Sequence, residues 1–438
     1  MARTEECILY RNFDNGKVLD IMTSLMNSYE AGEEGFENRK EEFFHMAGSL
    51  VEMAGMYGFS GNLWHTYLTQ LLVNHENAFS TASEIRGAVE GSINHLALHD
   101  FGIFKELYDF DLAVFDSAFG TDCADFLCNY VNTGCNSKVY NQRICDRICD
   151  MSKTLAEAST VEEFMADMVQ FYKDFGVGKL GLNKAFRIEH GKDGKPVIAP
   201  ITRIAHVNLD DLVGYEIPKQ KLIENTEAFV RGRKANNCLL FGDAGTGKSS
   251  SIKGILNRYY DEGLRIIEVY KHQFQDLNDV IAQIKNRNYK FILYMDDLSF
   301  EEFEIEYKYL KAVIEGGLEK KPDNILIYAT SNRRHLVREK SGDKLEVADD
   351  EDLHSSDTVQ EKLSLVYRFG VRIYFGAPNK KEFQNIVTTL AERYGVTMPA
   401  EELLMKANAW ELSHGGLTGR TAQQFIDHLL GKEETQEA

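Results

Sequence analysis

The residues that most clearly suggest chemistry form a glycine-rich octapeptide at positions 242–249, with the sequence G-D-A-G-T-G-K-S. It fits the phosphate-loop pattern G-x-x-x-x-G-K-[ST], and it stands between an apolar run at 238–241 and a helical pattern at 250–259, as that motif requires. Glycines let backbone N–H groups converge on phosphate oxygens, and a helix N-terminus adds positive potential. The pattern therefore predicts a nucleotide site. The residues expected to hold the phosphates are Gly242, Asp243, Ala244, Gly245, Thr246, Gly247, Lys248, Ser249 and Ser250.

Within this loop, Lys248 is expected to neutralise the β and γ phosphates and Ser249 to ligate Mg²⁺. A carboxylate at the end of a neighbouring buried strand should complete the metal site. Asp296 and Asp297 directly follow the apolar run Lys290–Met295 and fit that requirement. We expect Asp296 to hold Mg²⁺ through water and Asp297 to orient or deprotonate the attacking water. The alternative is that the two acids only cap a strand-to-helix turn.

Three more polar residues follow in an order that suggests a shared site. Asn332 comes after the apolar run 324–330, where an amide can reach the γ-phosphate or the attacking water from an adjacent strand. Arg368 precedes the last apolar run, Val371–Phe375, and Arg420 opens a helical pattern near the C-terminus. Isolated arginines are most often surface ion-pair partners, so only the order and spacing of these two favour a functional role.

The elements that must position these residues divide the chain into parts. Residues 1–187 show mostly helical spacing and contain no proline; for example, Thr160 and Glu163 form a capping-box signature. Residues 188–204 are polar and glycine-rich, typical of a linker or hairpin. Residues 205–377 alternate five short β runs with helical segments, which predicts an α/β core with a parallel five-stranded sheet. Residues 378–438 show only helical patterns and are expected to form a small lid.

Taken together, these residues resemble an AAA+ ATPase over positions 205–430. The resemblance rests on Gly214, the loop 242–249, Asp296, Asp297, Asn332, Arg368 and Arg420, in this order. Residues 209–214 are similar to the entry segment whose backbone holds adenine, which implies contacts at Val213 and Gly214. Asn332 is similar to sensor 1, Arg368 to the arginine finger and Arg420 to sensor 2. The phrases 235–240, 296–300, 328–335 and 361–365 resemble a bacterial family of predicted AAA+ ATPases whose cellular role is unassigned.

The resemblance implies an ATPase that uses ATP and Mg²⁺ and works as a ring or other homo-oligomer, because Arg368 of one subunit would act on the nucleotide of its neighbour. Two departures from the wider class matter. Asp297 replaces the usual Glu, and residues 270–275 lack the glycine typical of threading unfoldases. We expect ATP hydrolysis that remodels or regulates a protein partner. The alternatives are an ATP-dependent assembly switch with little turnover and a DNA-associated loader or transposition-type ATPase.

Composition limits the partners further. The 438 residues include 68 acidic and 49 basic side chains, a formal net charge of -19, and residues 1–200 alone carry a net -13. Bulk charge therefore disfavours nucleic acid or an acidic membrane as a partner, and the acidic N-terminal region is expected to bind a protein. No apolar run is long enough to span a bilayer, and the odd number of cysteines indicates reduced thiols. A cytoplasmic protein is expected.

Three weaker patterns leave alternatives open. Cys123, Cys128, Cys135, Cys145 and Cys149 cluster in sequence without Cys-x2-Cys pairs, which favours buried thiols over a metal or redox site. The basic residues Arg333, Arg334, His335 and Arg338 suggest either a subunit contact or a nucleic-acid contact. The stretch 341–357 holds seven acidic residues and is typical of a surface loop.

Overall fold

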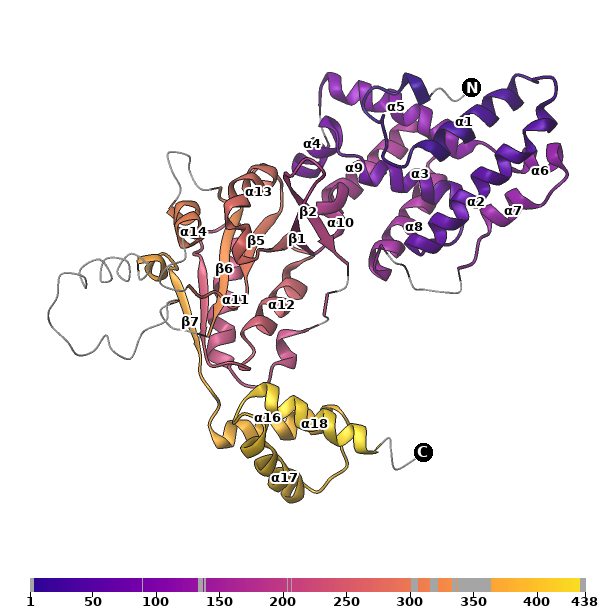
Figure 1. Ribbon diagram of the computed structural model, residues 1–438. Coiled ribbons are helices and arrows are strands. Elements are labelled where there is room, and N and C mark those ends of the chain that lie inside the picture. The colour runs from indigo at the N-terminus through magenta and orange to yellow at the C-terminus, as the bar shows by residue number, and fades with distance from the viewer. Residues whose placement is uncertain are drawn as a thin grey trace. The chain divides into compact units, whose positions relative to one another are not determined.

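The computed structural model describes residues 4–88, 90–132, 137, 139–202, 204–205, 207–300, 306–315, 322–332, 336 and 364–433. The predictions made above for Cys135, Arg333, Arg334, His335, Arg338 and the stretch 341–357 fall outside these residues. The chain consists of two compact units, Met1–Asn183 and Lys184–Ala438 (Figure 1). Among the described helices, none combines the length and the apolar character needed to cross a lipid bilayer.

The first unit is built from helices packed around one aromatic-rich core. Side chains cap several of these helices; for example, Thr160 accepts a hydrogen bond from the backbone N–H of Glu163 and so satisfies one of the free donors at the start of α9. The core includes the fully buried side chains of Trp64, Tyr67 and Tyr172. The elements are η1 (Thr4–Glu6), α1 (Lys17–Glu30), η2 (Phe36–Arg39), α2 (Lys40–Tyr57), α3 (Leu63–Asn74), α4 (Ala78–Arg86), α5 (Ser92–Asp109), α6 (Ala113–Phe119), α7 (Cys123–Cys128), α8 (Gln142–Glu157), α9 (Val161–Phe175) and α10 (Gly178–Leu182).

The described cysteines of this unit are free thiols. Burial raises the pKa of Cys123, Cys128 and Cys149, and it raises the pKa of Cys145 to about 11. These four groups therefore stay protonated at neutral pH, in the form that reacts poorly as a nucleophile or metal ligand.

The second unit contains a seven-stranded sheet with the order β2-β1-β4-β5-β6-β3-β7. Strands β1 and β3 to β7 pair with one another in parallel, whereas β2 pairs antiparallel with β1. The strands are β1 (Ala185–His190), β2 (Pro196–Ile201), β3 (Cys238–Gly242), β4 (Leu264–Glu268), β5 (Lys290–Met295), β6 (Ile325–Ser331) and β7 (Val371–Phe375).

The prediction of a five-stranded, all-parallel sheet was therefore wrong, although the five predicted runs do form β3 to β7. The hairpin of β1 and β2 adds the two extra strands. Phe186 and Ile188 are buried, while Arg187 and Glu189 between and after them are exposed, which is the alternation of an amphipathic strand. The apolar runs of β1 and β2 are short and lie on either side of a polar turn. The polar, glycine-rich turn was the more prominent pattern in the sequence, so the two strands were not predicted to join the sheet.

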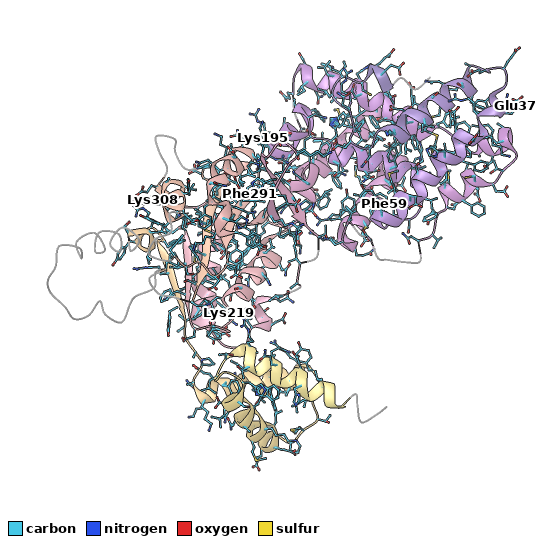
Figure 2. The ribbon with its side chains drawn as sticks, in the orientation of Figure 1. Glu37, Phe59, Lys195, Lys219, Phe291 and Lys308 are labelled. Atoms are coloured by element: carbon cyan, nitrogen blue, oxygen red, sulfur yellow. The ribbon has the colours of Figure 1, made fainter. Side chains whose placement is uncertain are left out.

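Helices cover both faces of this sheet. One face packs against α11 (Glu216–Val230) and α12 (Lys248–Tyr259), and its buried side chains include Tyr294 and Tyr328, which are register partners in β5 and β6. The opposite side of β5 includes the fully buried Phe291, labelled in Figure 2. η3 (Leu209–Asp211) packs with α12 on the first face. The other elements before the lid are η4 (Lys271–Asp276), α13 (Leu277–Ile284) and α14 (Glu306–Glu315).

Three helices after β7 form a lid subdomain with a small core of its own. They are α16 (Lys380–Arg393), α17 (Ala400–Ser413) and α18 (Gly419–Glu433). Phe383 and Phe425 are buried between them, and Val213 of the preceding core packs against the same cluster. The lid is therefore in contact with the segment that leads into the sheet.

Candidate functional site

A cleft of about 600 Å³ lies where the carboxyl ends of β3, β5 and β6 meet the lid. The phosphate loop, the two acids after β5 and the start of α18 all contribute to it, so segments distant in sequence converge there. The described residues that line it are Asp211, Leu212, Val213, Tyr215, Ala244, Gly245, Thr246, Gly247, Lys248, Ser249, Ser250, Asp296, Asp297, Thr330, Asn332, Ile386, Leu390, Gly419, Arg420, Gln423 and Gln424.

The phosphate loop leaves β3 by a route that only glycine permits. Gly242 has φ +136°, and a Cβ atom there would lie 2.1 Å from the carbonyl oxygen of Phe375 in β7. The carboxylate of Asp243 then accepts a hydrogen bond of 2.8 Å from the backbone N–H of Ala377, at the start of the connection to the lid. The loop is thus fixed to β7 and to the connection between β7 and the lid. Asp243 and Gly242 stabilise the loop from outside the cleft and do not line it.

Lys248, the first residue of α12, is buried, and its ammonium group folds back onto the loop. Its Nζ donates hydrogen bonds to the carbonyl oxygens of Gly242 at 3.0 Å and Asp243 at 2.6 Å. Burial lowers the pKa of Lys248, partly offset by the nearby carboxylates of Asp243, Asp297 and Asp296. A partly desolvated ammonium group at a helix N-terminus favours an anionic ligand, because the negative charge of a phosphate would offset the hydration that the ammonium loses on burial.

The carboxylate of Asp296 lies at the centre of a cluster of hydroxyl groups. Its Oδ1 accepts hydrogen bonds from Ser249 Oγ at 2.7 Å, Tyr294 OH at 2.7 Å and Thr330 Oγ1 at 2.5 Å. Burial disfavours the ionised form of Asp296, but these donors and the backbone of Asp297 outweigh it and lower the pKa of the carboxyl group. Asp296 is therefore held as an anion beside the hydroxyl of Ser249.

Asp297 follows with an unusual backbone conformation, φ +49°, in the left-handed region. Two side chains at the end of β6 and just after it contact Asp297, one at its backbone and one at its carboxylate. Thr330 Oγ1 accepts a hydrogen bond of 2.9 Å from the Asp297 N–H, and Asn332 Nδ2 donates one of 2.8 Å to Asp297 Oδ1. Strained backbone of this kind persists only where its surroundings over-determine it, and it is concentrated at functional sites.

The opposite, less polar end of the cleft is formed by the entry segment and the lid. Leu212, Val213 and Tyr215 line it from one side and Ile386 and Leu390 from α16 on the other. A flat heterocycle fits such walls better than a phosphate does.

Two cations hold the entry segment in place. Arg393 at the end of α16 donates hydrogen bonds of 2.7 Å to the carbonyl oxygens of both Asp210 and Asp211. Lys219 of α11, labelled in Figure 2, donates to the carbonyl oxygen of Leu212 at 2.7 Å. The lid and the entry segment are therefore tied together at the less polar end.

Arg420, the one arginine of the lid that was predicted from the sequence, lines the cleft near the loop. Its backbone N–H donates to the carbonyl oxygen of Gly245 at 3.2 Å, and a Cβ atom at Gly245 would lie 3.2 Å from the Cβ of Arg420. The start of α18 and the phosphate loop are thus in direct contact.

Arg368 lies elsewhere. It does not line the cleft, and its guanidinium donates to the carbonyl oxygen of Ser364 at 2.6 Å and to Ser364 Oγ at 2.9 Å, and it pairs with Glu315 at the end of α14. The structure thus brings together Val213, the loop from Ala244 to Ser250, Asp296, Asp297, Asn332 and Arg420 in one cleft, and it places Arg368 outside that cleft. Gly214 lies between the lining residues Val213 and Tyr215.

Sequence reasoning missed Thr330 and Tyr294, which contact Asp296 directly. A signal was available, because each stands two residues before a predicted site residue, Asn332 and Asp296, and residues two apart in a strand face the same side. It also missed the role of Arg393, for which a single basic residue near a helix C-terminus gives no distinctive pattern.

The donor set fits Mg²⁺, which prefers oxygen ligands and is usually bound by one or two carboxylates together with phosphate groups. Ser249 Oγ and the Asp296 carboxylate are the protein oxygens placed for it, with Asp297 adjacent. Lys248 and the loop N–H groups supply the complementary positive potential for phosphates. With the P-loop at the end of β3, parallel strands in the order β4-β5-β6-β3-β7 and a helical lid after β7, the fold is that of an AAA+ P-loop NTPase.

Comparison with known proteins gives one family match, to the family described as "Protein of unknown function (DUF815)", over residues 182–433. No curated protein matches the sequence. Solved structures that resemble the chain include a RuvB mutant of Thermotoga maritima, with 18% identity, a TM-score of 0.38 and coverage of 54% of this chain and 69% of that one.

Two further structures are similar to about the same degree. One is the FIGL-1 AAA domain in complex with ADP, at 16% identity and a TM-score of 0.35, covering 50% of this chain and 71% of that one. The other is the Aeropyrum pernix ORC1 protein in complex with DNA, at 16% identity and a TM-score of 0.36, covering 52% and 61%. The family match extends over more than half of the chain, from the end of the first unit to the last helix of the lid. The chain belongs to the family "Protein of unknown function (DUF815)".

Proposed function

We propose that this chain binds ATP together with Mg²⁺ and hydrolyses ATP to ADP and phosphate. The observation that carries the proposal is the convergence in one cleft of a phosphate loop, a hydroxyl–carboxylate pair and a second carboxylate held by an amide. Each of these parts has a separate task in phosphoryl transfer, and together they meet the requirement for positioning and charge stabilisation.

In this proposal the γ-phosphate of ATP lies against Lys248, whose ammonium leaves the loop carbonyls for the stronger charge of the phosphates. Mg²⁺, when bound by Ser249 and Asp296, neutralises charge on the β and γ phosphates. Asp297 accepts a proton from, or orients, the attacking water, and Asn332 fixes the Asp297 carboxylate through the bond to Oδ1. The left-handed backbone at Asp297 supports this role, because such strained conformations are concentrated at functional sites and the Asp297 carboxylate contacts the cleft-lining amide of Asn332.

Adenine is the base that we assign to the less polar end of the cleft. Leu212, Val213, Ile386 and Leu390 provide apolar walls for a flat ring. The arginine Arg393 holds the entry segment against the lid, so the two walls form one unit. ATP bound there would contact both the sheet and the lid, which gives the lid a means to respond to nucleotide.

The position of Arg368 outside its own cleft supports a shared site. An arginine that serves a neighbouring subunit has to be presented at the surface of its own, and the Arg368 side chain is 25% exposed. We propose that Arg368 acts on the nucleotide of an adjacent copy, so that the active form is a homo-oligomer. Arginine fingers supplied in this way raise turnover by several orders of magnitude in other nucleotide hydrolases, roughly 10³–10⁵.

The hydrogen bonds of Arg368 to Ser364 and its ion pair with Glu315 favour one second candidate, an assembly switch. An arginine held within its own subunit has to exchange those partners before it can serve another, so turnover stays low until assembly. The third element of the proposal is that ATP hydrolysis remodels or regulates a protein partner bound by the acidic N-terminal region, supported by the net charge of -13 over residues 1–200. A DNA-associated role remains the alternative.

Mixing two inactive variants tests the shared site. Lys248→Ala removes the phosphate lysine and Arg368→Ala removes the finger, so each variant alone should release phosphate far below the wild-type rate. In a 1:1 mixture, random pairing makes about one interface in four complete, and about a quarter of the wild-type rate should return. If Arg368→Ala alone matched wild type, with rates per subunit independent of concentration, the shared-site model would be wrong. Stimulation of wild type by duplex or single-stranded DNA would favour the DNA-associated alternative.

A further inference from the structure

We propose that Thr330 and Tyr294 are positioning residues for the metal-binding acid, and that they set the Mg²⁺ affinity of the nucleotide complex. This inference rests on the proposed function, because it assigns to Asp296 the task of holding Mg²⁺. It adds two residues, neither of which touches phosphate in the proposal. Both act through Asp296, and Thr330 also acts through the backbone of Asp297.

Thr330 is the stronger case because its one hydroxyl serves both acids. Oγ1 donates to Asp296 Oδ1 at 2.5 Å and accepts from the Asp297 N–H at 2.9 Å. The side chain is 1% exposed, so water cannot replace these bonds without a rearrangement of the strand ends. The hydroxyl orients the Asp296 carboxylate and holds the left-handed turn that presents Asp297. Loss of the hydroxyl removes one of the three donors to Asp296 Oδ1 and removes the acceptor of the Asp297 N–H.

Tyr294 supplies a second fixed donor from the strand that carries the acids. Its phenol donates to Asp296 Oδ1 at 2.7 Å, and the ring is buried against the face covered by α11 and α12. The ring is held by packing, which makes the donor rigid.

Together with Ser249, three hydroxyls converge on a single carboxylate oxygen. Tyr294 and Thr330 hold the Asp296 carboxylate in one orientation through these two hydrogen bonds. The Ser249 hydroxyl donates to the same oxygen, so its lone pairs face away from Asp296 and are available to a cation. Partners that orient a metal ligand in this way typically change metal affinity or activity by about 10- to 100-fold when they are removed.

The same sheet offers a matched control. Tyr328 is the register partner of Tyr294, is fully buried, and places its hydroxyl 2.9 Å from Asn225 Nδ2 and from Thr226 Oγ1. Its hydroxyl therefore has the same chemistry and the same sheet face but contacts α11 instead of the acids. Tyr328→Phe and Thr226→Val remove buried hydroxyls without changing the surroundings of Asp296.

The experiment measures binding of a fluorescent ATP analogue to the full chain as Mg²⁺ is titrated, and again in EDTA. The proteins compared are wild type, Thr330→Val, Thr330→Ser, Tyr294→Phe, Tyr328→Phe and Thr226→Val. We expect the half-saturating Mg²⁺ concentration to rise about 10- to 100-fold in Thr330→Val and by up to about 10-fold in Tyr294→Phe. Thr330→Ser should stay near wild type, because it retains the hydroxyl. Affinity in EDTA should be unchanged in all variants, and thermal unfolding checks that each is folded.

The outcomes separate the inference from the function on which it rests. Wild type that fails to bind the analogue, or binds it without any effect of Mg²⁺, would overturn the proposed function itself. Wild type that responds to Mg²⁺ while folded Thr330→Val and Tyr294→Phe respond equally would overturn only the inference. An equal rise in the two control variants would also overturn it, since the effect would then be a general consequence of losing a buried hydroxyl. If Thr330→Val does not fold, Tyr294→Phe decides the test.

Discussion

Replacement of Gly242 by alanine should destabilise the nucleotide-binding unit even when no nucleotide is present. The added Cβ would lie 2.1 Å from the Phe375 carbonyl oxygen and 2.7 Å from its carbonyl carbon, both backbone atoms of the neighbouring strand β7. Neither can rotate away as a flexible side chain would. A comfortable contact needs about 3.5 Å, so β3 and β7 would have to separate by more than about 1 Å at this point.

The expected cost is the sum of two terms. A side chain at φ +136° adds strain on the order of 1–3 kcal/mol. Separation of the strands adds the loss of the 3.0 Å hydrogen bond from the Asp243 N–H to Phe375, and an unsatisfied buried backbone group costs about 1–3 kcal/mol. The total is therefore about 2–6 kcal/mol, a large fraction of the stability of a typical domain.

Gly263→Ala is the matched control, because Gly263 has φ +93° but no atom within 4 Å of the added Cβ. It should cost only the strain term. Hydrogen–deuterium exchange of the β3 and β7 peptides, measured without nucleotide, reports the local free energy of opening for both variants. Equal protection of these strands in Gly242→Ala and Gly263→Ala would refute the argument that backbone approach dictates glycine at this position.

Two further predictions concern titratable groups. Because burial lowers the pKa of Lys248, its charged ammonium opposes folding at neutral pH. Lys248→Met should therefore abolish ATP binding measured by calorimetry, while the thermal unfolding midpoint without nucleotide stays equal to that of wild type or rises. A clear fall in that midpoint would contradict this reading. Burial also lowers the pKa of His65 and His75 below 6.5. Between pH 6.5 and the lowered pKa values, the unfolded chain therefore binds more protons than the folded chain, and the first unit loses stability as pH falls. Thermal scans from pH 7.5 to 5.5 should show that loss, and His65→Gln should remove part of it; a flat profile would exclude it.

The core of the site followed from sequence because its motifs are local. The loop around Lys248 and the strand that ends in Asp296 are each contained in a short run of residues, and the rule that parallel strands end at one edge brings them together. Asn332 was predicted to follow the third strand for the same reason. The geometry then places these residues in one cleft.

The rest depended on pairings that a single sequence does not specify. Thr330 reaches Asp296 because of the register of β6 beside β5, and that register is fixed by packing. Arg393 reaches the entry segment through a contact between residues about 180 positions apart in the chain. Residues 188–204 were predicted to be a linker or hairpin. The hairpin of β1 and β2 joins the sheet through the pairing of β1 with β4, which the local pattern does not specify.

The most direct test of the central claim is phosphate release by Asp297→Asn in single-turnover conditions with Mg²⁺ and ATP. Asparagine has the same shape as the acid but cannot accept a proton, while Lys248, Ser249 and Asp296 are unchanged. The account predicts that the variant binds ATP with near wild-type affinity and releases phosphate about 10²-fold or more slowly, the range expected when a positioned base is removed. Release at the wild-type rate would show that this carboxylate is not part of the chemistry.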